Sequence, residues 1–127
     1  MQKVIIKTDK APEPIGPYSQ AIQANGFLFL SGQIPIDPVS GNLHTGSFEE
    51  QCRLVLDNLK SVLEAGGSSV DQVVKVTIFL QDMQKFGEFN SVYAEYFNEA
   101  KPARACVEVS CLPKNTEIEI EAIALCS

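Results

Sequence analysis

Two segments near the end of this 127-residue chain carry the side chains best suited to chemistry. Residues 102–109 and 117–124 alternate between apolar and polar positions, a pattern typical of a strand with one apolar and one polar face. The polar faces carry Arg104, Cys106 and Glu108 on the first segment and Glu117, Glu119 and Glu121 on the second. We expect the two strands to be neighbours. An arginine and a row of carboxylates could then hold an anionic substrate and activate a water molecule beside it.

Arg104 and Glu119 are the strongest individual candidates. A guanidinium group binds a carboxylate through two parallel hydrogen bonds, which fixes the orientation of a bound acid as well as balancing its charge. A partly buried glutamate can have a raised pKa and act as a general acid or base on water. Simpler alternatives stay open at this point. Arg104 could form a surface ion pair with Glu119 or Glu121, and the glutamates could be a solvated stripe.

Four further residues could line a cleft. Tyr18 lies near the end of a proline-rich loop and Ser31 at the end of a strand, so both hydroxyl groups could face a ligand or simply satisfy turn backbone. Gly32 could present an open backbone N–H to an anion or be a plain turn glycine. Asn90, near the start of a predicted helix, is either a hydrogen-bonding site residue or an exposed polar one.

The cysteines and the single histidine limit the possible chemistry. Cys106 has no histidine near it in sequence, so we expect a small buried thiol rather than a nucleophile. The four cysteines show no C-x-x-C spacing, and we expect free thiols and no metal site. His44 is the only histidine, which excludes a ribonuclease mechanism that needs two.

The hydrophobic pattern predicts eight elements in the order β-β-β-α-β-α-β-β. Ser47 and Glu50 have the spacing of a capping box at the start of the first helix, and Gly66-Gly67 marks its end. Asp82 is the expected cap of the second helix. The predicted elements are strands 3–7, 21–24 and 27–30, a helix over 47–66, a strand over 73–80, a helix over 82–98, and the two C-terminal strands.

This order predicts an α+β fold, a mixed β-sheet covered on one face by two helices, in a single domain over residues 1–127. Helical periodicity turns the aromatic residues of the second helix inward. In the strand over 73–80 we expect the even-numbered residues, from Val74 to Leu80, to face the helices. The opposite sheet face would be apolar and uncovered in a monomer, which favours an oligomer contact. Its expected members are Val73, Phe79, Ile123 and Leu125.

Composition and charge exclude several classes of function. The chain is 45% hydrophobic and 20% charged, as in ordinary globular proteins. The first apolar segment is too short for a signal peptide and no run is long enough to span a bilayer, so the expected location is cytoplasmic. The net charge of −6, without a lysine or arginine cluster, makes nucleic acid an unexpected partner.

Several segments, taken in order, resemble one family. They are IGPYSQA at 15–21, SGQIP at 31–35, PAR at 102–104, LPK at 112–114 and IEIEAIA at 118–124. From about residue 8 to residue 125 the chain resembles the reactive intermediate/imine deaminase family (RidA/YjgF-like, also called the L-PSP endoribonuclease family). Lys101 and Cys111 depart from residues common in the family, so substrate range is less defined than reaction class.

The resemblance implies a chorismate-mutase-like fold assembled as a homotrimer, with sites in the clefts between subunits. It also implies a 2-iminobutanoate/2-iminopropanoate deaminase. This enzyme hydrolyses enamine/imine intermediates, such as 2-aminoacrylate or 2-aminocrotonate, to 2-keto acids and ammonia without cofactor or metal. The resemblance makes Arg104 the carboxylate clamp and Glu119 the residue that activates water. The remaining substrate-binding positions it implies are Tyr18 (from the neighbouring subunit), Ser31, Gly32, Asn90 and, mainly through its backbone, Cys106.

Two alternatives stay open. An endoribonuclease or translation inhibitor is an activity also attributed to the family, and the acidic charge and lone His44 speak against it. A trimer that binds small carboxylates without turnover is the other. Arg104 alone cannot separate binding from catalysis, whereas Glu119 beside it favours catalysis.

Overall fold

The computed structural model describes residues 2–126 and contains the eight predicted elements in the predicted order. Three short 3₁₀ turns join them: η1 (Val70–Gln72), η2 (Met83–Lys85) and η3 (Pro113–Asn115). The bounds of the strands and helices are β1 (Val4–Ile6), β2 (Ala21–Ala24), β3 (Phe27–Gln33), α1 (Phe48–Ala65), β4 (Val73–Leu80), α2 (Phe86–Phe97), β5 (Ala103–Glu108) and β6 (Ile118–Leu125).

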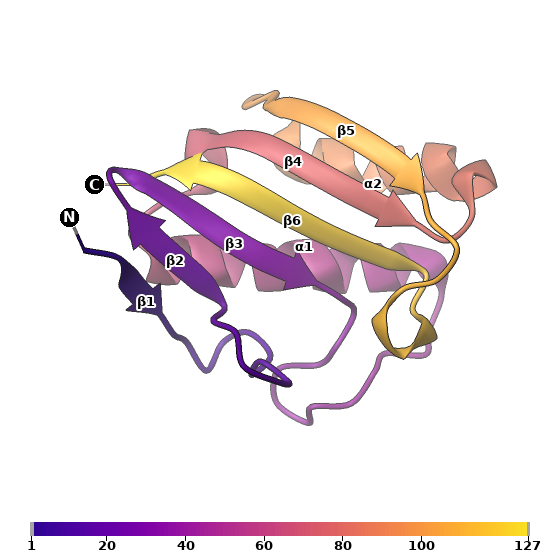
Figure 1. Cartoon of the computed structure of the whole chain (residues 1–127). Coiled ribbons are helices and arrows are strands. Elements are labelled where there is room, and N and C mark those ends of the chain that lie inside the picture. Colours follow the sequence, from indigo (N-terminus) through magenta and orange to yellow (C-terminus); the bar gives the residue numbers. More distant parts are fainter. Residues whose placement is uncertain (1, 127) are drawn as a thin grey trace.

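The strands form one six-stranded sheet in the order β1-β2-β3-β6-β4-β5 (Figure 1). Only β4 and β5 run parallel, joined through α2, and the other neighbours are antiparallel. The last strand of the chain, β6, therefore lies between β3 and β4, while β5 forms one edge. This arrangement confirms the predicted mixed sheet and decides which polar side chains can meet.

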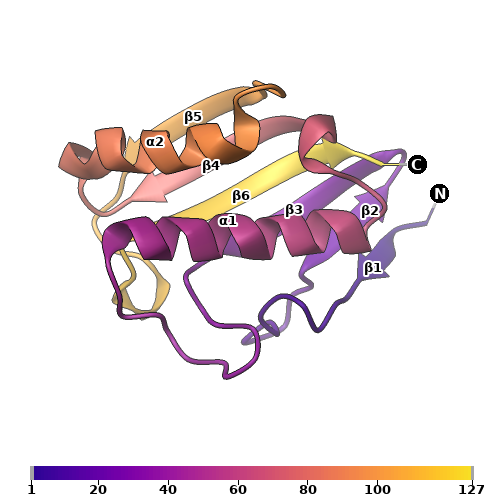
Figure 2. The ribbon, with the colours of Figure 1, turned by 180° about the vertical axis from the view of Figure 1, so that it is seen from behind.

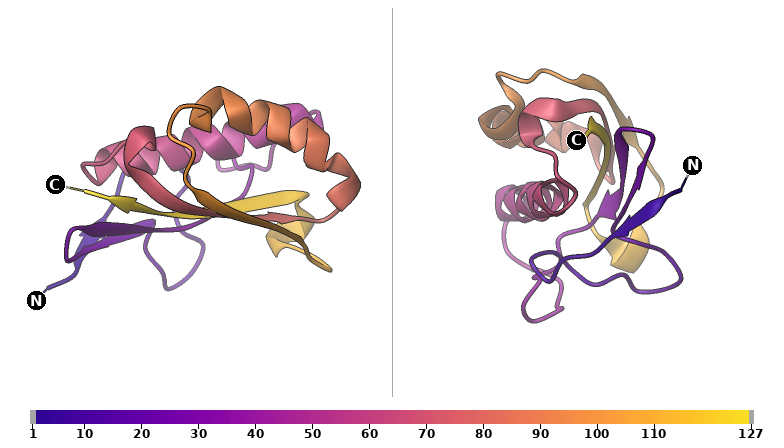
Figure 3. Two further views of the ribbon diagram at one scale, coloured as in Figure 1. Left: turned by 90° about the horizontal axis from the view of Figure 1, so that it is seen from above. Right: turned by 90° about the vertical axis from the view of Figure 1, so that its left-hand side faces the viewer.

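Both helices pack on the same face of the sheet, as predicted (Figures 2 and 3). The core between the layers is aliphatic on the sheet side, where Leu28, Ile78, Leu80, Ile118 and Ile120 are fully buried. Burial of side chains of this size stabilises the fold by roughly 1.5–3 kcal/mol each. Among the described residues, no helix has the length and apolar character needed to cross a membrane.

Helix α1 begins and ends where the sequence indicates. The Ser47 hydroxyl accepts a hydrogen bond from the Glu50 N–H, and the Glu50 carboxylate accepts one from the Ser47 N–H, so the predicted capping box is present. At the other end Gly66 lies directly against Leu28 of β3. A hydrogen atom is the only side chain that fits there, which fixes the position of α1 on the sheet.

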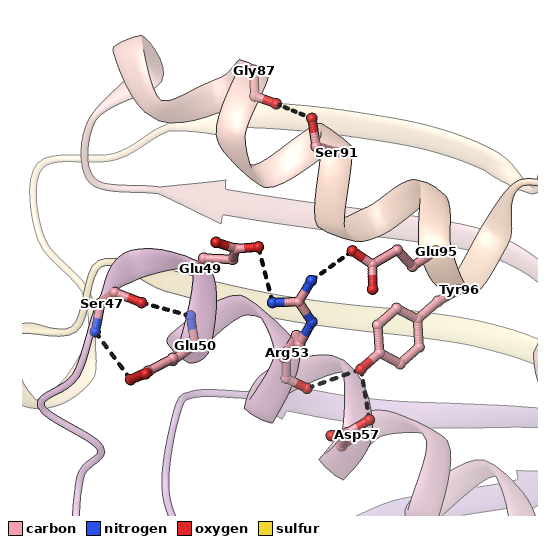
Figure 4. Close-up of polar contacts among 9 residues, drawn as sticks. All are labelled: Ser47, Glu49, Glu50, Arg53, Asp57, Gly87, Ser91, Glu95 and Tyr96. Atoms are coloured by element: carbon pink, nitrogen blue, oxygen red, sulfur yellow. Dashed lines mark hydrogen bonds and ion pairs between the residues drawn. The ribbon is translucent and has the colours of Figure 1, made fainter.

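A polar network joins the two helices on their outer side (Figure 4). The Arg53 guanidinium on α1 contacts Glu49 at 3.0 Å and Glu95 of α2 at 2.6 Å. The Tyr96 hydroxyl donates to Asp57 on α1 at 2.6 Å. These partly exposed contacts are weak individually and join α2 to α1 at the surface of the helical layer.

The start of α2 differs from the prediction. Asp82 caps the 3₁₀ turn η2, where its carboxylate accepts the Gln84 N–H at 2.9 Å, and α2 itself begins at Phe86. The predicted inward aromatic face is present, with Phe89, Tyr93 and Phe97 buried. Phe86 and Tyr96, which were expected to lie inward with them, are only half-buried.

The outer sheet face is apolar and uncovered in this chain, as predicted, with one error. Val73 is buried beneath the helices and Val74 is exposed, the reverse of the predicted alternation. The β4–β6 pairing shifts register between Val73 and Lys75, and such a bulge turns the residues before it to the other face. Leu125 is exposed and Phe79 and Ile123 are half-buried.

We expect Gly66→Ala to destabilise the protein through packing alone. The φ angle of Gly66 is −88°, so an alanine backbone is unstrained, but its methyl group would lie 2.6 and 2.7 Å from the two methyl carbons of Leu28. Overpacking of this kind costs about 1–3 kcal/mol. Gly87→Ala on α2 is the matched control, since its methyl group meets nothing within 4 Å. Urea unfolding at one protein concentration measures both, and a Gly66→Ala midpoint equal to that of wild type would contradict the close approach.

Candidate active site

Arg104 and Glu119 lie on opposite faces of the sheet. The expectation that their strands are neighbours is wrong, because β4 lies between β5 and β6. Arg104 pairs with Val76, whose side chain points to the helices, whereas Glu119 pairs with Phe79 on the outer face. The alternative of an ion pair between Arg104 and Glu119 or Glu121 is therefore also wrong. Each chain carries two separate groups of predicted site residues.

The first group surrounds Arg104 at the edge of the sheet. The Arg104 guanidinium donates from Nη1 to Asn90 Oδ1 on α2 at 2.7 Å, so the two predicted residues are in direct contact. Asn90 is half-buried, and the expectation of a freely exposed helix residue does not apply. A cavity of about 250 Å³ opens beside them, lined also by Tyr93 and Pro102. A carboxylate placed there would meet the exposed guanidinium.

Cys106 belongs to the Arg104 group but not as a nucleophile. It lies two residues after Arg104 on the same face of β5 and is half-buried. Burial raises the pKa of its thiol, and the nearby Arg104 charge only partly opposes this, so the neutral thiol predominates at neutral pH. All four cysteines are free thiols, as predicted.

The second group lines a larger cavity, of about 590 Å³, on the outer side of the sheet. The predicted residues Tyr18, Ser31, Gly32 and Glu119 all contribute to it. The Ser31 hydroxyl donates to the Ser19 carbonyl at 2.6 Å and so ties the strand to the preceding loop. The Tyr18 side chain is 53% exposed, and its hydroxyl accepts the Ile15 N–H at 3.3 Å. The Glu119 carboxylate lines this cavity, whereas Arg104 does not.

Gly32 lies directly beneath the Glu119 side chain. The β3–β6 pairing shifts register between Leu30 and Gln33, and Gly32 lies within this bulge. The Glu119 side chain crosses directly over it, so a methyl group at position 32 would lie 2.8 Å from the carboxyl carbon. Gly32 is therefore the floor beneath the carboxylate, a more specific role than that of a turn glycine.

The environment of Glu119 suits a proton acceptor. Partial burial raises the pKa of its carboxyl group above the usual range, and the negative charge of Glu121 on the same strand face raises it further. A carboxylate with a raised pKa holds a proton more readily at neutral pH, which favours general acid–base chemistry on water. The predicted solvated stripe therefore describes Glu121, which is exposed, but not Glu119. It does not describe Glu117 either, which is half-buried and contacts Lys85 and Gln51.

Sequence reasoning missed three supporting residues. Gln20 is buried, and its amide donates to the carbonyls of Thr8, Ala11 and Pro12 and accepts the Thr8 N–H. It holds the proline-rich loop that carries Tyr18. Lys114, with a φ of 56°, lines the Glu119 cavity. Tyr93 lies beneath Arg104. The sequence signal for Gln20 is a polar residue directly before an alternating strand, whereas Tyr93 is indistinguishable from a core aromatic.

Comparison with known proteins identifies the family. Residues 8–126 match the family model described as endoribonuclease L-PSP. A RutC family protein from Pyrococcus horikoshii is 59% identical over 122 residues, covering 96% of this chain and 97% of the relative. A putative endoribonuclease from Thermotoga maritima has the same fold, with a TM-score of 0.96, 53% identity and 100% and 99% of the two chains covered. The structure of E. coli TdcF with bound serine gives a TM-score of 0.91 at 42% identity, covering 98% and 99%.

The fold defines a small α+β protein with a mixed sheet covered on one face by two helices, as the sequence predicts, and it carries the two groups of predicted site residues. The extent and identity of these matches show more than a shared fold. The chain belongs to the RidA/YjgF family, which is also called the endoribonuclease L-PSP family.

We expect the contact between Gly32 and Glu119 to appear in a double-mutant cycle. Gly32→Ala should destabilise the protein because the new methyl group displaces the Glu119 side chain. In a Glu119→Ala background the obstacle is gone, so the same substitution should cost less, by about 0.5–3 kcal/mol. Urea unfolding of the four proteins measures the difference. Equal costs in both backgrounds would show that the two residues are not in contact.

Glu119 should also give stability a pH dependence of definite sign. Because burial raises its pKa above the ordinary value of 4.5, the folded protein binds this proton more tightly than the unfolded chain. The stabilising effect is complete below the unfolded-state pKa and is lost as the pH rises through the folded-state pKa. Glu119→Gln should therefore unfold at a higher temperature than wild type at about pH 7.5, and the advantage should vanish at about pH 4.

The matched control for this pH dependence is Glu99→Gln, an exposed carboxylate beyond the end of α2. Calorimetry at one protein concentration would compare the three proteins across the pH range. A Glu119→Gln variant that is less stable than wild type at neutral pH, with the control unchanged, would contradict a desolvated carboxylate.

Proposed function

We propose that the protein is a deaminase that hydrolyses reactive enamine/imine intermediates, such as 2-aminoacrylate or 2-aminocrotonate, to 2-keto acids and ammonia. The active form is a homotrimer in which the Arg104 group of one subunit meets the Glu119 group of another. The observation that carries this proposal is the separation of the two groups on opposite sheet faces within one chain. Each group holds half of what the reaction needs, and the uncovered apolar sheet face offers a contact for a second subunit.

The chemistry divides between the two groups in a simple way. The imine carbon is already electrophilic, so the site needs no covalent nucleophile. Arg104 binds the substrate carboxylate and fixes the carbon in place, which lowers the entropic part of the barrier. The serine bound in E. coli TdcF is a carboxylate ligand, which supports this class of substrate.

Glu119 acts on the water. The water oxygen forms a bond to the imine carbon, the π electrons move to nitrogen, and the Glu119 carboxylate accepts the proton that the water loses. The tetrahedral intermediate then collapses. The proton held by Glu119 goes to the nitrogen, and the carboxylate then carries the hydroxyl proton to the same nitrogen. The carbon–nitrogen bond breaks to release ammonia as the C=O double bond forms. A carboxyl with a raised pKa is suited to both steps.

RNA cleavage is the competing function, because the family model and two similar structures are named for it. The charge of −6 opposes binding to a phosphate backbone. His44 contacts Glu50 at 3.0 Å near the start of α1, outside the cavities of Arg104 and Glu119. These observations favour the small-molecule substrate.

We expect wild-type protein to accelerate loss of the imine released by a serine or threonine dehydratase, with matching release of keto acid and ammonia. Arg104→Ala should lower the rate about 100-fold or more because the acid loses its orientation. Glu119→Gln should lower it by about 10²–10⁴ because the water loses its proton acceptor. Arg53→Ala removes an arginine remote from both cavities and serves as the control.

The result that contradicts the proposal is a folded wild-type protein that leaves the imine lifetime unchanged. RNA cleavage by the same preparation, retained in Arg104→Ala, would then favour the ribonuclease. Saturable binding of 2-oxobutanoate without acceleration would favour a carboxylate-binding protein.

A further inference from the structure

Arg104 lies across an aromatic surface of α2 rather than extending into solvent. The central carbon of its guanidinium, Cζ, is 4.8 Å from the ring centroid of Tyr93 and 5.4 Å from that of Phe86. Both distances fall within the roughly 6 Å over which a cation is attracted to a ring face. Phe86, Asn90 and Tyr93 are spaced by four and three residues, which places all three on one side of the helix.

The Tyr93 ring is held in place more firmly than the arginine it supports. Tyr93 is buried, stacks on Phe97 with centroids 4.7 Å apart, and contacts Phe89 at 5.5 Å. Phe86 continues the row, 6.4 Å from Phe89. Arg104 is exposed. A long exposed side chain normally samples many rotamers, so a fixed surface beneath it restricts the plane of the guanidinium.

The hydroxyl of Tyr93 lies near the Arg104 guanidinium but forms no well-aligned hydrogen bond with it. Its oxygen is buried, and among residues 2–126 it has no hydrogen-bond partner. Burial raises the pKa of the phenol, and the nearby Arg104 guanidinium only partly opposes this rise. The central carbon of the guanidinium lies over the ring face. The ring face of Tyr93 is therefore the surface on which the Arg104 guanidinium rests, and the contribution of the hydroxyl is what Tyr93→Phe measures.

We propose that Phe86 and Tyr93 are positioning residues that, together with Asn90, set the plane and direction of the Arg104 guanidinium for the substrate carboxylate. The Asn90 side-chain oxygen, Oδ1, accepts the hydrogen bond from Arg104 Nη1 at 2.7 Å. Within the described chain Nη2 and Nε make no hydrogen bond, so both remain for the acid. This inference deepens the proposed function and rests on the carboxylate-binding role of Arg104.

The test compares the ring with the hydroxyl, using 2-oxobutanoate as a stable monocarboxylate probe. Titration calorimetry on the intact protein at fixed ionic strength gives Kd without requiring turnover. Tyr93→Phe keeps the ring and should bind within about twofold of wild type, whereas Phe86→Leu and Tyr93→Leu should each bind about tenfold more weakly. In the imine assay Phe86→Leu should raise KM and leave kcat within about twofold.

Tyr96→Leu is the matched control. Tyr96 is on the same helix, but its hydroxyl contacts Asp57 on α1 rather than Arg104. Its loss should lower thermal stability and leave Kd unchanged, which separates general weakening of α2 from loss of the aromatic surface. Tyr93→Leu removes a core ring and is informative only if circular dichroism shows it folded. Phe86→Leu and Tyr93→Phe decide the question without it.

Three results would overturn the inference. They are a Phe86→Leu variant that binds the acid as wild type does, a Tyr93→Phe variant weakened as much as Phe86→Leu, and a wild-type protein that does not bind the acid saturably. A different result separates this inference from the proposed function. If Arg104→Ala itself binds the acid normally, Arg104 does not bind the substrate carboxylate. The proposed function then fails, whatever the effect of the aromatic residues on Arg104.

Discussion

Burial of alternate residues on β6 is the constraint on which the site depends. Ile118 and Ile120 are fully buried beneath the helices, and β6 is paired on both sides, so its register cannot slip without exposing them. The period of two then forces Glu119 and Glu121 onto the outer face. The bulge at Gly32 on the neighbouring strand makes room for one of these carboxylates and partly removes it from water. The position and partial burial of Glu119 are thus consequences of the core.

The same alternation directs Arg104 the other way. Strand β5 is parallel to β4, and its pairing places Arg104 on the helix-facing side at the edge of the sheet, where α2 supplies Asn90 and the aromatic rings. No rotation of side chains brings Arg104 and Glu119 together through a sheet with a packed core. The proposed function uses both residues and therefore requires a second copy of the chain.

The fold was largely predictable because its signals are local. The capping box at Ser47, the stop at Gly66 and the alternation of the strands determine the elements, and all of them are present. The pairing of strands is not a local property. The strands β5 and β6 follow each other in sequence and are predicted to be neighbours. No local sequence signal indicates that β4 lies between them. The faces of Val73 and Val74 are predicted wrongly for the same reason, because the bulge that reverses them depends on the pairing with β6.

The candidate site was predictable residue by residue but not in its arrangement. Tyr18, Ser31, Gly32 and Glu119 do share one cavity, and Arg104 and Asn90 share another. The division into two groups requires the sheet order. Tyr93 was missed because a tyrosine at an inward helical position predicts only core packing.

Subunit complementation tests the central claim, that one site is built from two chains, most directly. Arg104→Ala and Glu119→Gln are each expected to be inactive as homo-oligomers. After co-refolding at equal ratio, an interface between an Arg104→Ala subunit and a Glu119→Gln subunit can combine an intact Glu119 with an intact Arg104. The account predicts recovery of about a quarter of the wild-type imine deaminase activity in randomly mixed oligomers. Mixed oligomers that form and remain inactive would contradict it.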